Sequence, residues 1–414
     1  MSDIFEIFDQ KASKIDIRSL ISSPGFYLKY RDSINKTENG EYLYYKEIRY
    51  RNLVPLEFEK EPEKFWALIK FHRKVSGIKT KISDRQNILF TWHQLNFHQK
   101  LLQEIDFTMK DYLNDPDYVK YQKKALMEEA IASAQLSGSY TSRIVAEQML
   151  KEKLIPKTPA KKMIYNNFAM LQLIDKKYQH KRLNLDILLD LHKTLGANII
   201  NNTTLGYFAN KNDPFFQKEI KKFITFANDE LEEDIFIHPI IKASMLHFWV
   251  LFLNPFDEGN GRMARAIFYW YLLRKGYKLF SILPISLVIK NTKDDYDRSN
   301  LLSISDDNNL TYFIDYKIRI IQKTLNNFKH FINQKNSENW RTNHFLKLHP
   351  NLNHRQINIL EALYHVSYKP ITLTSHKNIH EITKVTAIKD LKGLEKLKLI
   401  KGVKEGRSIF YKKI

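Results

Sequence analysis

The sequence predicts a mainly α-helical fold, and three observations lead to this prediction. Residues 119–332 read as nearly continuous helix, interrupted by proline and glycine at intervals that suit helix ends. The apolar run from Ile240 to Leu253 is typical of a buried helix and is too short to span a bilayer. Alternation of apolar and polar residues, which indicates strands, occurs near the C-terminus at 399–403 and 407–411.

Composition narrows the class of protein. The chain has 414 residues, enough for two to three domains, and its 43% apolar and 27% charged residues are typical of a globular protein. Because no long apolar run occurs and the start Met1–Glu6 is acidic, unlike a signal peptide, we expect a cytoplasmic protein without a membrane span. A chain without cysteine forms no disulfide and has no catalytic thiol or Cys-ligated zinc.

Four segments are expected along the chain. Residues 1–118 form a first region that mixes helical patterns, such as the amphipathic stretch Phe65–Lys74, with a charged and aromatic segment. Residues 119–332 form the helical core, residues 333–350 a polar linker, and residues 351–414 a separate small domain. The sequence of the first region does not indicate its function.

Residues 351–414 are predicted to fold as a winged helix-turn-helix. Helical patterns occupy 355–364, 374–382 and 383–397, and the two strands follow. A tight turn at 404–406 would join these strands into the hairpin that forms the wing.

The C-terminal domain also concentrates positive charge in a chain whose net charge is +20. From Asn353 onward there are 13 Lys or Arg and 5 Asp or Glu, a net charge of +8 in 62 residues. Such an excess favours nucleic acid, although a lysine-rich solvated surface would give the same totals. The third helix would present its start to the DNA major groove, and Arg407 on the wing would touch phosphate or the minor groove. The residues expected to face DNA are Lys384, Thr386, Ala387 and Lys389. Use of the module for protein contacts, including a homodimer, is the open alternative.

The most informative stretch is Asn254–Arg265, which reads Asn-Pro-Phe-Asp-Glu-Gly-Asn-Gly-Arg-Met-Ala-Arg. Because a second helix follows, the Gly259–Gly261 turn lies at a helix N-terminus, where unpaired N–H groups and the helix dipole favour phosphate. Arg262 and Arg265 are three apart on one helix face and can bind phosphate oxygens. Glu258 offers a hard oxygen ligand for Mg²⁺. A helix–loop–helix with an ordinary glycine turn is the simpler alternative.

This stretch resembles the signature of the Fic (fido) family, His-Pro-Phe-x-Asp/Glu-Gly-Asn-Gly-Arg-x-x-Arg. The resemblance implies a helical bundle that transfers AMP, or another nucleotide moiety, from ATP or another nucleoside triphosphate to a hydroxyl side chain of a target protein. It also implies Mg²⁺ bound by Glu258, and it makes the first region and the winged helix similar to parts of larger Fic proteins. The nucleotide-binding residues implied by the resemblance are Phe256, Gly259, Asn260, Gly261, Arg262 and Arg265.

Asn254 departs from the family pattern at the catalytic position. Family enzymes have histidine there as the general base that removes the proton from the target hydroxyl. Asparagine has no group that titrates near neutral pH, so it cannot act as that base. The resemblance therefore predicts an impaired catalytic centre.

Two further departures concern regulation and substrate docking. The segment 128–138 resembles the family's inhibitory segment, in which Ser133 and Gly138 match but Ser137 stands where a glutamate would pair with Arg265. An ordinary contact between small residues of two helices is the alternative. Phe208 also replaces an arginine, and the stretch that follows is short for the hairpin that docks a target backbone.

Three functions stay open at this point. The first is a Fic-type nucleotidyltransferase scaffold that binds ATP and Mg²⁺ but transfers poorly, which leaves its status as an enzyme uncertain. The second is a regulatory protein that senses nucleotide and binds DNA. The third is a phosphotransferase that binds the nucleotide in reverse, or a transferase that is still active through another base.

Overall fold

The protein is mainly α-helical, as predicted. A computed structural model describes residues 12, 14–21, 24–80, 82–83, 90–112, 118–210, 212–230, 235–348, 351–364, 371–380, 382–405 and 408–414. The chain divides between Leu325 and Asn326 into two compact units, which are described separately below. Among the described residues, no helix is both long enough and apolar enough to cross a membrane.

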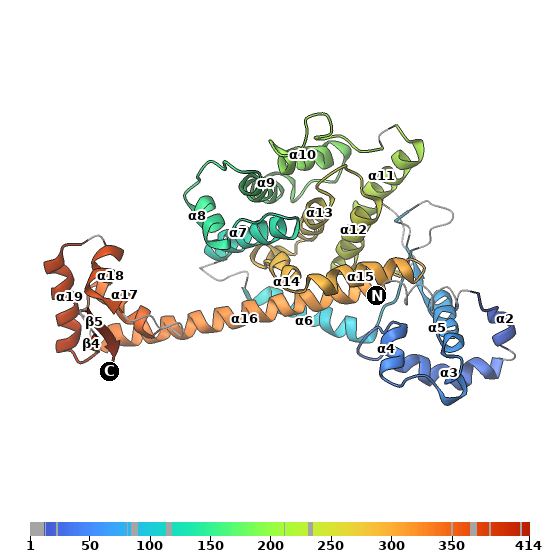
Figure 1. Ribbon diagram of the computed structural model, residues 1–414, viewed down its shortest axis with the longest axis horizontal. Coiled ribbons are helices and arrows are strands. Elements are labelled where there is room, and N and C mark those ends of the chain that lie inside the picture. Colours follow the sequence, from blue (N-terminus) through green and yellow to red (C-terminus); the bar gives the residue numbers. More distant parts are fainter. Residues whose placement is uncertain are drawn as a thin grey trace. The chain divides into compact units, whose positions relative to one another are not determined.

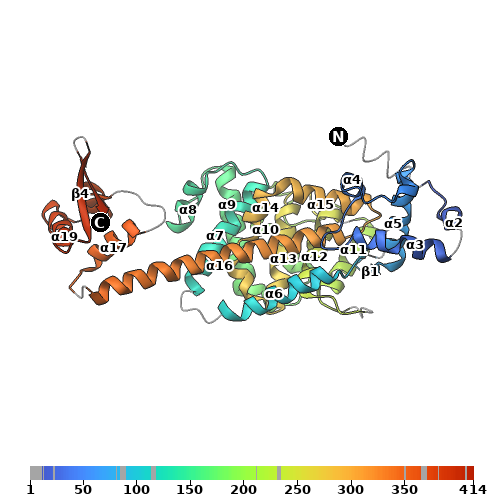
Figure 2. The ribbon, with the colours of Figure 1, turned by 90° about the horizontal axis from the view of Figure 1, so that it is seen from below.

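The first unit begins with short helices and a two-stranded sheet at one end of the unit (Figure 2). Its elements are α2 (Ile17–Leu20), α3 (Pro24–Lys36), α4 (Tyr45–Tyr50), the 3-10 helix η1 (Leu56–Phe58), α5 (Pro62–Ser76), β1 (Ile78–Lys79), β2 (Thr91–Trp92) and α6 (Asn96–Tyr112). The strands pair antiparallel, with Ile78 opposite Trp92. The amphipathic stretch predicted at Phe65–Lys74 lies in α5 and buries Trp66 and Leu68.

The rest of the first unit is a bundle of helices. Its elements are α7 (Tyr118–Leu136), α8 (Arg143–Lys151), α9 (Pro159–Leu173), the π-helix η2 (Ile174–Tyr178), α10 (Leu185–Gly196), α11 (Pro214–Ala227), α12 (Pro239–Leu253), α13 (Asn260–Arg274), the 3-10 helix η3 (Lys278–Ile282), α14 (Ile285–Asn291), α15 (Lys293–Ser305) and the first part of α16 (Thr311–Leu348). The apolar helices α12 and α13 pack together at the centre of the bundle (Figure 1). Nearly all residues of both helices are buried, in agreement with their largely apolar sequences, and the buried polar residues include Lys242, Arg262 and Arg265.

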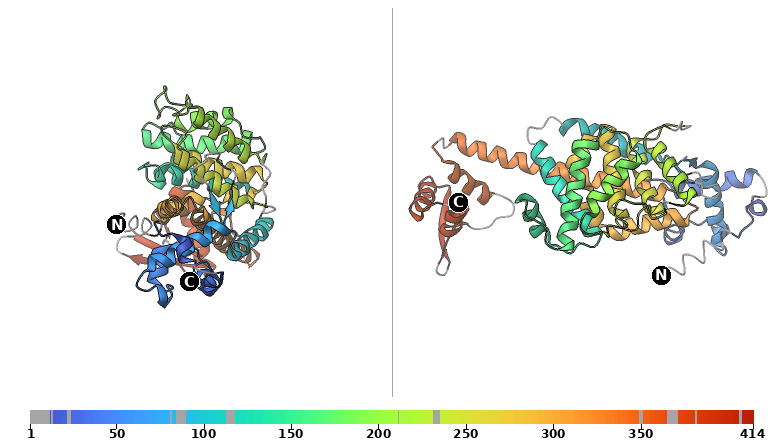
Figure 3. Two further views of the ribbon diagram at one scale, coloured as in Figure 1. Left: turned by 90° about the vertical axis from the view of Figure 1, so that its right-hand side faces the viewer. Right: turned by 90° about the horizontal axis from the view of Figure 1, so that it is seen from above.

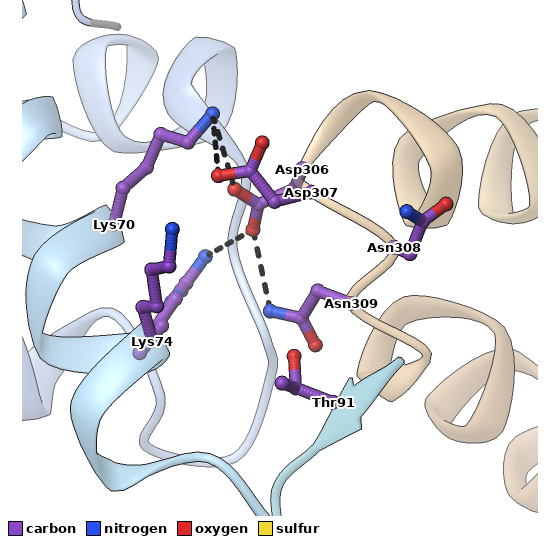
Figure 4. Close-up of a pocket in the computed structure, with 8 residues that line it drawn as sticks. Lys70, Lys74, Thr91, Asp306, Asp307, Asn308 and Asn309 are labelled. Carbon is purple, nitrogen blue, oxygen red and sulfur yellow. Dashed lines mark hydrogen bonds and ion pairs between the residues drawn. The ribbon is translucent and has the colours of Figure 1, made fainter. Parts of the chain in front are cut away.

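Arg73 on α5 joins the two parts of the first unit. Its side chain is 2% exposed and points toward the loop between α15 and α16. That loop contributes the buried carboxylate of Asp306, whose Oδ2 lies 3.8 Å from Nη1 of Arg73. Lys70, one helical turn earlier, lies 3.7 Å from both Asp306 and Asp307 (Figure 4). These residues line a small polar pocket of about 190 Å³.

Among its described residues, the second unit contains the later part of α16, three further helices and a three-stranded antiparallel sheet (Figure 3). After α16 they are α17 (His354–Tyr364), β3 (Ile371–Thr372), α18 (Leu373–Ile379), α19 (Lys384–Lys396), β4 (Ile400–Glu405) and β5 (Ser408–Lys413), with the strand order β3-β5-β4. In the preceding segment, predicted as a linker at 333–350, residues up to Leu348 lie in α16.

A buried carboxylate holds α17, α18 and α19 of the second unit together. Asp390 on α19 accepts hydrogen bonds from Arg355 at 2.7 and 3.1 Å and from Asn353 at 2.8 Å, and it lies 3.2 Å from Nε2 of His376. Burial alone would raise the pKa of Asp390, but these contacts outweigh it and lower the pKa.

The prediction that Ala387 faces DNA is wrong. Ala387 is fully buried in the core of the second unit, as are Leu391 and Leu394 on the same face of α19. Lys384 and Lys389 are exposed, and Thr386 is partly exposed, with its hydroxyl 2.9 Å from that of Thr383. Arg407 lies outside the described residues.

Candidate functional site

The loop between α12 and α13 begins with a reversal of the backbone at Asn254. This residue has φ 47° and ψ 61°, the left-handed conformation that commonly ends helices, and its N–H donates to the carbonyl of Val250. The Asn254 side chain is exposed, whereas the next two residues, Pro255 and Phe256, are buried. Asn254 therefore stands at the rim of the loop, open to solvent.

Asn260 fixes the shape of the loop. Its Oδ1 accepts a hydrogen bond from the N–H of Phe256 at 3.0 Å, and its Nδ2 donates to the carbonyl of Phe256 at 2.6 Å. Gly259 has φ 86°, and a Cβ there would lie 3.0 Å from Leu195 on α10. Only glycine fits this position without strain. The Asn260 side chain thus holds the loop closed, and the backbone N–H groups at the start of α13 are left to face an anion.

His192 on α10 binds the backbone of the loop, a role that no sequence motif indicated. Its Nδ1 accepts from the N–H of Gly206 at 3.0 Å, so Nε2 carries the proton and donates to the carbonyl of Glu258, also at 3.0 Å. Its ring stacks on Phe256 with centroids 3.9 Å apart. Burial lowers the pKa of His192, against the opposing effect of its contact with Glu258. The imidazole is neutral, and both ring nitrogens are already used.

The two arginines of the motif are buried side by side on the first turns of α13. Arg262 is 4% exposed and Arg265 is 7% exposed. Arg262 donates from Nη1 to the carbonyl of Leu195 at 3.2 Å, and its buried Nε has no hydrogen-bond partner among the described residues. Burial and the neighbouring Arg265 lower the pKa of Arg262 to about 10, so it stays charged at neutral pH. In the part of the chain that the structure describes, neither guanidinium forms an ion pair with a carboxylate.

Arg265 is held by neutral oxygens at the end of α7. Its Nε donates to Oγ of Ser133 at 2.7 Å, and its Nη2 donates to the Ser133 carbonyl and to Oγ of Ser137, each at 2.9 Å. Gly138, with φ 97°, follows directly. The segment that resembles an inhibitory segment therefore does contact Arg265, and it does so through neutral hydroxyl and carbonyl groups. The charge of Glu129 acts on Arg265 without forming an ion pair with it among the described residues.

Glu258 is the residue that could hold a divalent cation at this loop. Its side chain is exposed beside the start of α13. No group of three or more His, Asp or Glu with the geometry of a metal site occurs within the described ranges. One carboxylate fits Mg²⁺ only if other oxygens complete the shell, because Mg²⁺ is commonly bound through one or two carboxylates and the phosphates of a nucleotide. The Glu258 carboxylate is thus suited to a cation whose other ligands are oxygens of a bound polyphosphate.

The segment after α10 packs onto the loop. Phe208 stacks on Phe256 with centroids 5.2 Å apart, and the N–H of Ala209 donates to the carbonyl of Pro255 at 3.0 Å. Helix α11 already begins at Pro214. Little chain is left here for a hairpin that could add a substrate strand.

His247 is buried away from the loop. It is 0% exposed, and its Nε2 lies 2.9 Å from the hydroxyl of Tyr296. Burial lowers the pKa of His247 well below its ordinary value, and Lys317 and Arg265 add to this effect. It is a core histidine, in agreement with its position on the apolar helix α12, and it has no route to a solvent-exposed hydroxyl.

The structure thus brings together Asn254, Phe256, Glu258, the Gly259–Gly261 turn and both arginines at one site. Ser133, Ser137 and Gly138, far away in sequence, join the site through Arg265. The residues predicted to bind DNA belong to the second unit.

Comparisons with known proteins relate part of this chain to one family. Residues 182–272 match the Fic/DOC family. A protein adenylyltransferase Fic of Nematostella vectensis is 23% identical over 269 residues, which cover 59% of this chain and 58% of that protein. The protein adenylyltransferase fic-1 of Caenorhabditis elegans is 24% identical over 148 residues, or 34% of this chain and 27% of that protein. The chain therefore spans less than two thirds of the length of these relatives.

A similar solved structure is that of a Fic family protein from Desulfovibrio desulfuricans G20. The similarity covers 78% of this chain and 97% of that one, with a TM-score of 0.50 and 15% sequence identity. At this identity the likeness supports the fold alone.

Proposed function

Because residues 182–272 form a Fic/DOC domain, we propose that this chain binds ATP with Mg²⁺ at the 254–265 loop as a protein nucleotidyltransferase scaffold whose transfer step is impaired. One observation carries the proposal. Two buried arginines lie at a helix N-terminus without a carboxylate partner among the described residues. Buried charges are normally paired, so this arrangement is best explained by a polyanion that completes it.

The residues of the loop would divide the work of binding. The N–H groups of the Gly259–Gly261 turn would bind the phosphates, Arg262 and Arg265 would hold the outer ones, and Phe256 would form the apolar floor. Mg²⁺, held by Glu258 and the phosphates, would neutralise charge that develops during transfer. Asn260 and His192 would keep the loop in shape, since their side chains bind its backbone.

Impairment is proposed because the described histidines near the loop cannot replace the missing base. Asn254 is exposed at the required position but does not titrate in the range of a general base. His192 uses both ring nitrogens to support the loop, and His247 is buried against Tyr296. A target hydroxyl would therefore keep its proton. The partners of the proposed scaffold are the nucleotide and, for any residual transfer, a target protein with a hydroxyl side chain.

The binding proposal is tested by replacing Arg262 with glutamine. We expect the affinity for ATP with Mg²⁺ to fall about 10- to 100-fold, because a charged hydrogen bond to phosphate is lost from a buried position. Isothermal titration calorimetry measures this change. Arg274→Gln is the matched control, because Arg274 ends the same helix and pairs with Asp229 instead of facing the loop. Absence of binding to the unmodified chain, or equal affinity of the two variants, would contradict the proposal.

DNA binding by the second unit is a second candidate function, which would make the chain a regulator that senses nucleotide. It is favoured by the exposed Lys384 and Lys389 at the start of α19, in a domain with a net charge of +8 from Asn353 onward. The proposal is supported by the order of helices and strands in this unit, in which the hairpin of β4 and β5 would be the wing. The first turns of α19 would enter the major groove.

This second candidate predicts salt-sensitive binding to duplex DNA. Replacing Lys384 and Lys389 together with glutamine is expected to weaken binding and to reduce the slope of log affinity against log salt by about 2, because two phosphate contacts disappear. Electrophoretic retention at several salt concentrations measures the slope. The double control Lys392→Gln and Lys396→Gln changes the same helix farther from its start. An identical slope for both pairs would remove the support for this helix as the reader of DNA.

A phosphotransferase that binds the nucleotide in reverse is the remaining alternative, and the intact glycine turn makes it the least favoured. The mass added to a modified protein separates transfer of AMP from transfer of phosphate.

A further inference from the structure

Lys317 on α16 is a buried lysine outside the 254–265 loop. Its side chain is 0% exposed, and its Nζ has no hydrogen-bond partner within the described residues. The Nζ lies 3.7 Å from the centre of the Phe268 ring on α13. A lysine in this position is costly because a buried charge without a partner loses its hydration.

A second buried lysine shows what ordinary pairing looks like in this protein. Lys242 on α12 is 4% exposed and also lies over a phenylalanine ring, that of Phe226, at 4.3 Å. Its Nζ, however, forms an ion pair with Asp229 at 2.9 Å. Both lysines are buried and lie over a phenylalanine ring. Among the described residues, Lys242 has a carboxylate within 4.0 Å, whereas the Nζ of Lys317 has none. Structural packing accounts for Lys242, and Lys317 needs another explanation.

Lys317 contacts α13 close to Arg265, because Phe268 lies one helical turn after Arg265 on that helix. The charged and titratable groups that act on it or share its surroundings come from the helices packed around it. These are Glu129 on α7, Arg265 on α13, His247 on α12 and Tyr296 on α15. Glu129 is the carboxylate of this group, and it is already bound by the N–H of Ser286 at 2.7 Å and by the Ser286 hydroxyl. Its charge acts on both Arg265 and Lys317, and Arg262 adds a third cation beside Arg265.

The positive charge in this part of the core therefore exceeds the negative charge. We propose that Lys317 is a positioning residue of the phosphate site, a second layer of positive charge behind Arg265 whose protonation is coupled to binding of the outer phosphates of a nucleotide. This inference rests on the proposed binding of ATP. Lys317 would not touch the nucleotide but would act through Arg265, because charges interact strongly across a dry interior.

The coupling has a definite sign. Burial lowers the pKa of Lys317 to about 7, Arg265 adds to this effect, and Glu129 opposes it. A polyanion at Arg265 favours the protonated form and raises this pKa, so binding takes up protons near and above pH 7. ATP affinity should then fall as pH rises above about 7, and it should level off above the pKa of the bound form. In the free protein, stability should rise between pH 7 and 10, because the unfolded chain keeps the Lys317 proton that the folded chain has lost.

Lys317→Met tests the inference, because methionine is similar in size and carries no charge. We expect ATP affinity at pH 6.5 to fall about tenfold and to lose most of its dependence on pH. Calorimetry in two buffers of different ionisation enthalpy should show proton uptake for the unmodified chain and less for the variant. The variant should also be more stable at pH 7, with a midpoint of thermal unfolding raised by about 2–4 °C. A purely structural lysine would lose stability without moving the pH profile.

Lys242→Met is the matched control, with lower stability and unchanged ATP affinity as the expected result, because it leaves Asp229 without its partner. If Lys317→Met binds ATP as tightly as the unmodified chain and with the same pH profile, the inference is wrong while the proposed function stands. If the unmodified chain binds no ATP at any pH, the proposed function fails and the inference fails with it.

Discussion

Replacing Asn254 with histidine is expected to raise the rate of nucleotidyl transfer by about 10²–10⁴-fold, the usual contribution of a general base. The other residues proposed to bind the phosphates and Mg²⁺ lie around this position, namely two buried arginines and an exposed Glu258. The missing element is a group that accepts the proton of the attacking hydroxyl. Restoring that group should therefore restore the reaction if the cradle binds nucleotide as proposed.

The backbone should accept this histidine. Position 254 has φ 47°, a left-handed conformation in which asparagine, aspartate and histidine are all several-fold enriched. The Asn254 side chain is exposed, so a larger ring needs no new cavity. The contact of Ser137 with Arg265 is neutral, so no carboxylate at this position competes with the phosphates for that arginine.

The measurement is incorporation of label from ATP labelled on the α-phosphate, with Mg²⁺, into the chain itself and into proteins of a cell lysate, followed by intact-mass analysis. Asn254→Gln is the control, because it preserves the amide and adds length without a titratable group. The double variant Asn254→His with Arg262→Gln should lose the gained activity. Transfer by the unmodified chain at the rate of Asn254→His would show that Asn254 does not limit the reaction. If the Asn254→His variant binds ATP but transfers no nucleotide, a different part of the site limits the reaction. The short segment before α11, which would have to dock the target, is then the next part to test.

Local patterns in the sequence predicted the helices of this site well because their signals lie within a few residues. The apolar run Ile240–Leu253 lies in α12, and the second helix predicted after the glycine turn is α13. The error at Ala387 was avoidable, since Ala387, Leu391 and Leu394 follow the spacing of an apolar face. A recognition helix presents only its polar face, and that criterion would have excluded Ala387.

The supporting residues of the site could not be predicted in the same way. His192 binds the carbonyl of Glu258, 66 positions later, and nothing in the sequence around His192 indicates that contact. The charge of Lys317 did leave a local signal, because it falls on the face of α16 that buries Ile314 and Ile321. The sequence alone could not say which groups surround that charge, and its relation to Arg265 depends on how α13 and α16 pack.

Replacing Arg73 with methionine is expected to lower the free energy of unfolding of the first unit by about 3–5 kcal/mol, the usual effect of breaking a buried ion pair from one side. The Arg73 guanidinium donates to Glu38 at 3.1 Å, to the hydroxyl of Tyr312 at 2.7 Å and to the carbonyl of Leu43 at 2.9 Å. It also lies 3.9 Å from the centre of the Tyr42 ring. Methionine fills much of the volume but satisfies none of these groups.

The loss should arise mainly from the carboxylates that Arg73 leaves behind. Asp306 still has Lys70 as a cation at 3.7 Å, about as near as Arg73 was at 3.8 Å, together with neutral donors such as Asn309. Adding Asp306→Asn to Arg73→Met should therefore cost less than the sum of the two single changes, because the second change removes a buried charge that has already lost one of its two cations. Urea unfolding of the four chains gives this comparison as a double-mutant cycle.

An exposed ion pair of the same region provides the control. Lys29 lies 2.8 Å from Glu57, and both side chains are at least half exposed, so Lys29→Gln should change stability only within the narrow limit typical of surface ion pairs. If Arg73→Met falls within the same limit, the buried network does not hold the first helices to the core. If Arg73→Met lowers stability strongly but additively with Asp306→Asn, the two residues act independently. The contribution of Arg73 to stability then comes from its aromatic contacts.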